Sequence, residues 1–208
     1  MKPTLTTTNL FGSPGRVNVL RILWRVDIPM TAAEVARRAG LSHPAASAIL
    51  RSLLWEGILA SSPAGRGHVY WMPKDNIYVE RFLDPVFSAE VEVPVLMLAE
   101  LCDVIGPFAV SVVLFGSYAR GDQNAASDVD FVAVAEDAPS KDRLERAVAS
   151  YAAEFERRFG ATLSPLVYDR AEAAELIDRA PDLWQSILSE GVTACGIGPD
   201  EWRRAATS

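Results

Sequence analysis

The sequence predicts an α+β protein in which a helical N-terminal part with a β-hairpin is joined by a helix to a small mixed α/β part. Capped helical patterns dominate up to residue 57, whereas two short apolar runs with strand character lie between residues 109 and 135. The two parts of the chain also differ in net charge. Residues 1–80 hold nine Lys/Arg against five Asp/Glu, a net +4, and residues 81–208 hold eleven against twenty-two, a net −11. A basic N-terminal part on an acidic chain suggests that this part meets nucleic acid.

The composition is that of a globular protein, because half of the 208 residues are apolar and 23% are charged. No apolar run reaches the roughly 18 residues of a membrane span, and the segment from Met1 to Leu5 lacks the apolar core of a signal peptide. Cys102 and Cys195 have no metal-ligand spacing, so we expect reduced core residues. We therefore expect a cytoplasmic protein without membrane association.

The N-terminal part begins with a Thr-rich segment, residues 1–13, which we expect to be flexible. Three helices follow, and each has a capping residue at its start: Ser13 before Pro14, Thr31 in a capping box with Glu34, and Ser42 before His43. Gly40 and Gly57 are the predicted ends of the second and third helices. The second and third helices, joined by Gly40-Leu41-Ser42, form a predicted helix-turn-helix.

A β-hairpin is predicted after the third helix, since apolar residues at 58–60 and 69–72 flank a turn at 63–67. Residues 14–72 would then form a winged helix-turn-helix, and they resemble the winged domains of bacterial transcriptional regulators. The predicted DNA contacts lie on the third helix and the hairpin tip: Ser42, His43, Ser47, Arg51 and Arg66. Winged domains also serve as protein–protein modules, which is the alternative interpretation.

Residues 73–106 are predicted to be a linker and a helix, with a kink near Pro94. The apolar residues of this helix could pack on the sheet that follows or form a dimer contact, and we expect a homodimer. Residues 107–195 form the predicted mixed α/β domain, and residues 196–208 are expected to be a loose C-terminal tail.

The most informative stretch joins two apolar runs in the C-terminal part. The first run, 109–115, ends at Gly116-Ser117, and after ten intervening residues the pair Asp128 and Asp130 opens the second run. Side chains two apart in a strand share a face, so both carboxylates would point the same way beside the Gly-Ser turn. Two carboxylates suit Mg²⁺, and a glycine turn lets backbone N–H groups approach a phosphate. The stretch predicts a metal–triphosphate site; a plain β-turn with two solvated aspartates is the alternative.

This pattern resembles the nucleotidyltransferase superfamily of the polymerase-β type, and more narrowly the minimal nucleotidyltransferases found beside or within toxin–antitoxin pairs. The resemblance implies that Asp128 and Asp130 are catalytic and hold Mg²⁺, and that Gly116 and Ser117 bind the phosphates of ATP or another triphosphate. Arg120 would neutralise phosphate charge or, alternatively, pair with Asp122. The acceptor would be a protein hydroxyl, for example on a cognate toxin.

The family usually supplies a third carboxylate from the next strand, often as general base. In the predicted strand 162–168, Ser164 or Pro165 takes that place, and a serine cannot accept a proton as a carboxylate does. Asp169 follows the strand and is expected to cap the next helix, which contains Glu172. The sequence therefore predicts nucleotide binding and leaves enzymatic turnover open. The alternative function is a winged-helix regulator or antitoxin whose nucleotidyltransferase domain is a sensor or inactive.

Overall fold

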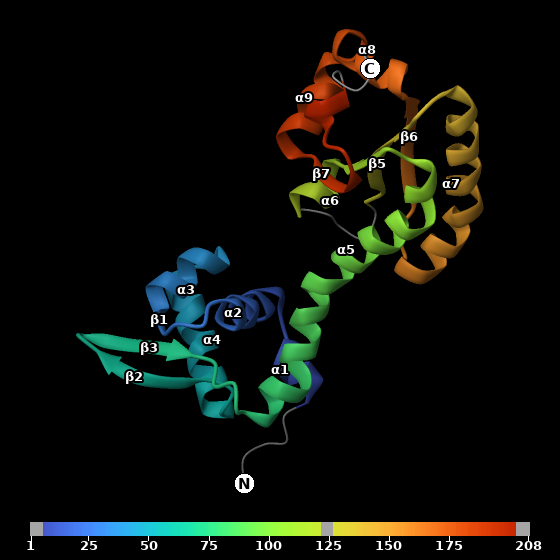
Figure 1. Ribbon diagram of the computed structural model, residues 1–208. Coiled ribbons are helices and arrows are strands. Elements are labelled where there is room, and N and C mark those ends of the chain that lie inside the picture. Colours follow the sequence, from blue (N-terminus) through green and yellow to red (C-terminus); the bar gives the residue numbers. More distant parts are fainter. Residues whose placement is uncertain (1–5, 122–126, 203–208) are drawn as a thin grey trace. The chain divides into compact units, whose positions relative to one another are not determined.

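The computed structural model describes residues 6–121 and 127–202 (Figure 1). The chain divides into two compact units, Met1–Glu92 and Val93–Ser208, and the division falls within the long helix α5 (Asp84–Ile105). Pro94, where the sequence predicts a kink, lies inside this helix, which is assigned as one element on both sides of it. None of the helices in the described part of the chain is both long and apolar enough to cross a membrane.

The first unit combines helices with a small antiparallel sheet of strand order β1-β3-β2 (Figure 1). Its elements before α5 are α1 (Thr7–Phe11), α2 (Pro14–Arg25), β1 (Met30–Thr31), α3 (Ala32–Ala39), α4 (His43–Glu56), β2 (Ala60–Ala64), β3 (Gly67–Trp71) and the π-helical turn η1 (Val79–Leu83). Apolar residues of α2, α3 and α4, among them Leu20, Val35 and Leu50, form the core of this unit.

The helix starts follow the predicted caps, because each capping side chain accepts a hydrogen bond from a backbone N–H of the first turn. Ser13 accepts from Arg16, Thr31 from Glu34, and Ser42 from Ala45, at 3.2, 3.3 and 3.4 Å. Such caps satisfy backbone donors that have no partner within the helix. Between α3 and α4 the chain turns at Gly40, which adopts a left-handed conformation with φ 64°.

The N-terminal stretch that the sequence analysis expects to be flexible contains the helix α1. The side chain of Leu10 is only 1% exposed and packs into the core. Its carbonyl accepts a hydrogen bond from Nε of Arg16 at 3.0 Å, and the same buried guanidinium contacts Ser52 and Glu56 of α4. Burial of an apolar side chain and a shared hydrogen-bond network hold this segment in place.

The second unit is built on a mixed sheet of strand order β6-β5-β4-β7, in which only β5 and β6 run parallel. Its elements after α5 are η2 (Gly106–Phe108), β4 (Ser111–Leu114), α6 (Gly116–Arg120), β5 (Val129–Ala135), α7 (Ala138–Phe159), β6 (Leu163–Asp169), α8 (Arg170–Arg179), α9 (Pro181–Glu190), β7 (Val192–Gly196) and η3 (Pro199–Glu201). The sheet has a core on each face. Phe131 packs with residues of α5 and α7, whereas Val132 packs with residues of α8 and α9.

The C-terminal segment contradicts the expectation of a loose tail as far as residue 202. The Trp202 side chain is 2% exposed and packs in the same core as Val113 and Ile187. Its indole N–H donates to the Ser111 hydroxyl at 3.0 Å, and that hydroxyl donates to the carbonyl of Ile197 at 2.6 Å. A buried tryptophan with a satisfied N–H fixes a segment that composition alone suggests is irregular.

Cys102 and Cys195 are free thiols, in line with the sequence expectation, yet they lie next to each other in the fold. Burial raises the pKa of Cys102 to about 12, and a hydrogen bond with Cys195 adds to the effect. The raised pKa keeps the Cys102 thiol protonated at neutral pH, which makes it a poor nucleophile.

Candidate functional site

The candidate site lies where β4 ends and β5 begins. These two strands are antiparallel neighbours, with Leu114 paired to Phe131, and the N–H of Phe115 donates to the carbonyl of Asp130 at 3.0 Å. The chain leaves β4 at Phe115 and enters α6 at Gly116. The sheet register therefore sets Gly116 beside the first residues of β5.

Gly116 lies against the Asp130 carboxylate, in a backbone conformation that favours glycine. A Cβ atom added at Gly116 would lie 2.7 Å from Oδ2 of Asp130, and Gly116 has a φ of +71°. A side chain here would meet both a steric contact and a backbone conformation that L-residues rarely adopt. The structure thus brings the Gly-Ser turn and the second acid of the Asp-x-Asp pair together, as a shared site requires.

At the start of β5, the side chains of Asp128 and Asp130 lie on either side in sequence of the buried side chain of Val129. Val129 is 1% exposed and packs in the core formed with α5 and α7, whereas Asp128 is exposed and Asp130 is half-buried. Alternation of side chains in an extended chain gives the two carboxylates the face opposite to Val129. The segment 122–126, which includes the suggested Arg120 partner Asp122, lies outside the described residues.

Arg120, at the end of α6, pairs with an acid that sequence reasoning missed. Its Nη1 lies 2.6 Å from Oε2 of Glu190, the last residue of α9. The two residues are 70 positions apart, so no local pattern could identify the pair. Ser117 is half-buried in the first turn of α6, one residue from Gly116. Glu190 therefore belongs among the residues surrounding the candidate site.

The strand register decides which residue takes the place of the third carboxylate. Asp130 pairs with Ser164 across the parallel strands β5 and β6, and Pro165 pairs with Phe131. Directly paired residues of neighbouring strands have side chains on the same face. Ser164 is therefore the residue beside Asp130 on the site face, and it cannot supply a carboxylate.

Asp169 has a structural role, as predicted. It forms a capping box at the start of α8, in which its Oδ1 accepts from the N–H of Glu172 at 2.8 Å and its own N–H donates to Glu172 at 3.0 Å. Lys141 of α7 approaches the Glu172 carboxylate at 2.6 Å. The hydrogen bond from Lys141 and then that from the Asp169 N–H lower the pKa of Glu172. These acids stabilise a helix start, away from the acid pair of β5.

The two carboxylates of the candidate site suit a divalent ion that takes only part of its coordination shell from the protein. Among residues 6–121 and 127–202, no three His, Cys, Asp or Glu side chains cluster in a way that could enclose a metal. Mg²⁺ commonly binds through one or two carboxylates, with waters and substrate phosphates completing its shell. Asp128 and Asp130 fit that arrangement, since they supply two carboxylates and no further ligand is required from the protein.

The residues predicted to contact DNA lie mostly on the surface of the first unit. Ser42, His43, Arg51 and Arg66 are exposed, whereas Ser47 is half-buried. The Ser42 side chain caps α4, so its hydroxyl oxygen already has a structural use. Trp55, one turn beyond Arg51 on α4, is 68% exposed and was not singled out from the sequence.

Comparison with known proteins places the site in a family. The family described as "Nucleotidyltransferase domain" matches residues 97–186, which include the Gly-Ser turn and both aspartates. A Methanocaldococcus jannaschii protein, "Putative protein adenylyltransferase MJ0141", is 31% identical over 67 residues, covering 32% of this chain and 67% of its own length. A second protein of that organism, "Putative protein adenylyltransferase MJ1305", is 38% identical over 66 residues, covering 31% of this chain and 44% of its own length.

A solved structure described as "Crystal structure of the toxin-antitoxin with AMP-PNP" is also similar, with 18% identity and a TM-score of 0.35 over 54% of this chain and 84% of that one. This likeness is too low to carry an argument about ligands or partners. Residues 97–186 match the family, and the chain is 31% identical to a relative of which it covers two thirds. The chain belongs to the nucleotidyltransferase domain family.

Proposed function

We propose that the second unit binds a Mg²⁺-bound nucleoside triphosphate, ATP first among them, and transfers its nucleotidyl group to a hydroxyl of a protein. The observation that carries the proposal is the Asp130 carboxylate lying against Gly116, which has the left-handed backbone conformation that favours glycine. The two relatives named as protein adenylyltransferases support the choice of ATP and of a protein acceptor.

Each site residue has a distinct task in this proposal. Asp128 and Asp130 hold Mg²⁺, which neutralises phosphate charge when it is bound. The backbone N–H groups at Gly116 and Ser117 and the Ser117 hydroxyl bind the β- and γ-phosphates. Arg120 exchanges its contact with Glu190 for a phosphate oxygen. Positioning and charge neutralisation of this kind supply most of the catalysis in transfer reactions at phosphorus.

The transfer step also requires removal of a proton. The acceptor oxygen forms a bond to the α-phosphorus, the bond to the oxygen bridging the α- and β-phosphorus atoms breaks, and pyrophosphate leaves with that electron pair. The acceptor proton must go to a base, and Ser164 is unsuited to that role. We therefore expect binding to be intact and transfer to be slow, with the proton passing to water or to a base of the partner.

Binding and transfer need separate experiments. Isothermal titration of ATP with Mg²⁺ is expected to show binding by the wild type and its loss in Asp128→Asn/Asp130→Asn. The exposed Asp182→Asn on α9 is the matched control and should bind as the wild type does. Metal-dependent binding that survives in the double variant would refute the proposed site.

For transfer, label from α-labelled ATP should appear on a partner protein in the presence of the wild type and not of the double variant. A cognate toxin encoded beside this chain is the first acceptor to try, because the sequence resembles antitoxin-like nucleotidyltransferases. Intact binding without label on any neighbouring gene product would support a sensor or an inactive domain instead.

A second function, DNA binding by the first unit, is favoured by its geometry. We infer that α2, α3 and α4 with the hairpin β2–β3 act as a winged helix, because α3 and α4 meet at the left-handed Gly40 and the hairpin presents Arg66 to solvent. The net charge of +4 over residues 1–80 would favour contact with phosphates. In this reading α4 enters the major groove, with the chain acting as a dimer.

A gel shift with the DNA upstream of the chain's own gene tests this function. Arg51→Ala should weaken DNA binding, since one phosphate or base contact is gone. Its affinity should also fall less steeply with rising salt concentration than the affinity of the wild type. Arg25→Ala, an exposed arginine on α2, is the control and should have a smaller effect. Absence of any shift, or equal loss in both variants, would remove the winged-helix function.

A further inference from the structure

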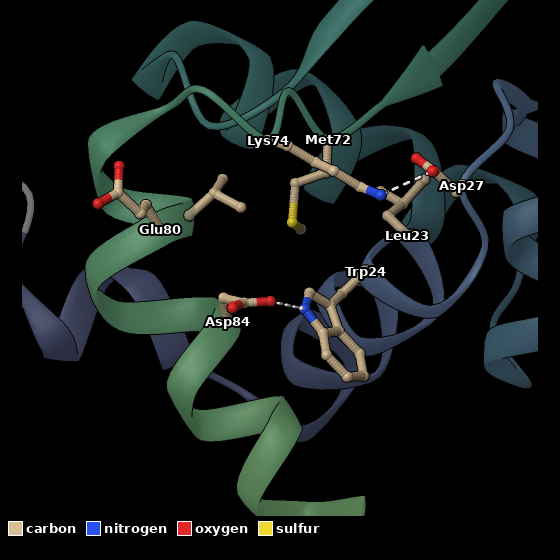
Figure 2. Close-up of a pocket in the computed structure, with 8 residues that line it drawn as sticks. Leu23, Trp24, Asp27, Met72, Lys74, Glu80 and Asp84 are labelled. Carbon is tan, nitrogen blue, oxygen red and sulfur yellow. Dashed lines mark hydrogen bonds and ion pairs between the residues drawn. The ribbon is translucent and has the colours of Figure 1, made fainter.

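The first unit contains a cavity of about 280 Å³ that neither proposed function uses (Figure 2). It lies between the end of α2, the segment that follows β3, and the first turn of α5. The residues that line it are Leu23, Trp24, Asp27, Met72, Lys74, Val79, Glu80 and Asp84. All of them belong to the unit Met1–Glu92, so the cavity is formed within one compact body.

The cavity has an apolar floor and one aromatic wall. Leu23, Met72 and Val79 are buried at 3%, 7% and 3% exposure, and they form the apolar lining. The half-buried indole of Trp24 stands beside them and is supported from behind by Phe87, with ring centroids 5.6 Å apart. An apolar surface of this kind favours binding of the apolar part of a ligand, because contact removes apolar area from water.

The charged groups of the lining give the cavity a negative surplus. Lys74 pairs with Asp27 at 2.7 Å, and both side chains are largely exposed at the rim. Glu80 pairs with Arg81, which does not line the cavity. Asp84 differs, since no basic side chain in the described part of the chain pairs with it.

Asp84 is held in place facing the aromatic wall. Its Oδ1 accepts from the indole N–H of Trp24 at 2.9 Å, and Figure 2 shows the two side chains directed toward each other below Met72. Asp84 is an exposed residue, and this hydrogen bond gives its carboxylate a defined orientation at the N–H edge of the indole. A carboxylate in this position attracts a cation by charge–charge attraction, and the rest of the indole ring offers apolar surface to the body of the ligand.

We propose that this cavity binds a small organic cation, an amine on an alkyl or aryl body, with its ammonium at Asp84 and its body on Leu23, Met72 and Trp24. An anionic molecule of the same size would be repelled by the surplus carboxylates. The ligand would contact the first turn of α5, the helix whose later residues belong to the nucleotidyltransferase unit. The ligand would thus bind outside both the nucleotide site and the predicted DNA-contacting surface.

Benzylamine, with benzyl alcohol as its neutral counterpart, tests the proposal on the full chain. The indole N–H signals in a two-dimensional nitrogen–proton NMR spectrum report each of the 5 tryptophans, and Trp24→Phe assigns the Trp24 signal by its disappearance. Benzylamine should shift the Trp24 signal in a saturable way, and benzyl alcohol should bind at least about tenfold more weakly, since it lacks a charge-assisted hydrogen bond.

Asp84→Asn separates charge from shape, because an asparagine oxygen can still accept from the Trp24 indole. This variant should weaken benzylamine at least about tenfold and leave benzyl alcohol unchanged. Glu92→Gln removes the same charge from an exposed position of α5 outside the cavity and should change neither. Equal binding of the amine and the alcohol, no effect of Asp84→Asn, or no saturable shift of the Trp24 signal would each overturn the proposal.

Discussion

Strands β5 and β6 lie side by side in one sheet, in register from Val129 opposite Leu163 to Ala135 opposite Asp169, yet they differ in where they carry acid. Asp128 directly precedes β5, and Asp130, the second residue of the strand, lies beside Gly116. In β6 the level of Asp130 is occupied by Ser164, and the acid, Asp169, comes at the other end, five residues away, or roughly 16 Å along the strand. The two neighbouring strands thus carry acids at opposite ends.

In the proposed function, ligand binding and chemical turnover rest on different strands. Asp128 and Asp130 would hold a metal-bound triphosphate without help from β6, since two carboxylates suffice when the phosphates complete the shell. A proton acceptor would have to come from the level of Ser164. Substitutions can disturb the close approach of Gly116 to Asp130, supply a carboxylate at Ser164, and then alter acids near each of the two strands.

The largest effect is expected from Gly116→Ala. The added Cβ would lie 2.7 Å from the Asp130 carboxylate, in a backbone conformation with φ +71°. We expect about 100-fold weaker Mg–ATP binding together with a loss of about 1–3 kcal/mol in the free energy of unfolding. Titration calorimetry and thermal denaturation measure the two quantities.

Gly121→Ala is the matched control for that change. Gly121 has almost the same φ, +73°, but a Cβ there meets nothing within 4 Å. It should cost stability through backbone strain while leaving most of the nucleotide affinity. If both variants lose affinity equally, the close approach of Gly116 to Asp130 is not what forms the site.

Ser164→Asp should erase the difference between the two strands. It sets a carboxylate directly beside Asp130 and supplies a general base, for which about a tenfold gain in transfer is a conservative expectation. The measurement is the rate at which label from α-labelled ATP reaches a protein acceptor. Ser164→Asn has a similar shape without charge and should give no gain; a gain in both variants, or in neither, would contradict the assigned role of this position.

Glu190→Gln should sharpen the account of the β5 site by removing one contact of Arg120. Their contact of 2.6 Å involves partly exposed side chains, so its loss changes free energy by no more than about 1 kcal/mol. A triphosphate would then bind up to about fivefold more tightly. Glu175→Gln, which breaks the pair with Arg179 on α8, is the control. Weaker binding in Glu190→Gln would mean that Glu190 itself serves the ligand.

Local signals predicted much of this structure because they depend on neighbouring residues. Ser13, Thr31 and Ser42 cap the helices expected of them, and the second apolar run became β5 with the expected start at Val129. The Asp-x-Asp pair was visible for the same reason, since its spacing alone sets the face of both acids. These features need no knowledge of distant parts of the chain.

Features that depend on distant contacts could not be read in this way. Arg120 contacts Glu190, and Ser111 contacts Trp202, which packs in the core although the composition of its segment suggests a tail. The choice between Ser164 and Pro165 likewise required the strand register. The cavity at Trp24 and Asp84 joins residues 60 positions apart and left no mark in the sequence pattern.

The smallest effect concerns the acidic end of β6 and tests that its role is structural. The hydrogen bond from Lys141 lowers the pKa of Glu172, so this carboxylate contributes stability above its unfolded pKa, near 4.5, and the contribution is lost as pH falls through the lower folded pKa. Because the pair is partly exposed, Glu172→Gln should lower the melting temperature by about 2 °C at pH 7. The melting curves of variant and wild type should converge near pH 3, while Mg–ATP affinity at pH 7 stays unchanged. Glu92→Gln, an exposed acid of α5, should show no such pH-dependent difference. A fall in nucleotide affinity in Glu172→Gln would mean that the far end of β6 does serve the site, and the contrast between the two strands would no longer hold.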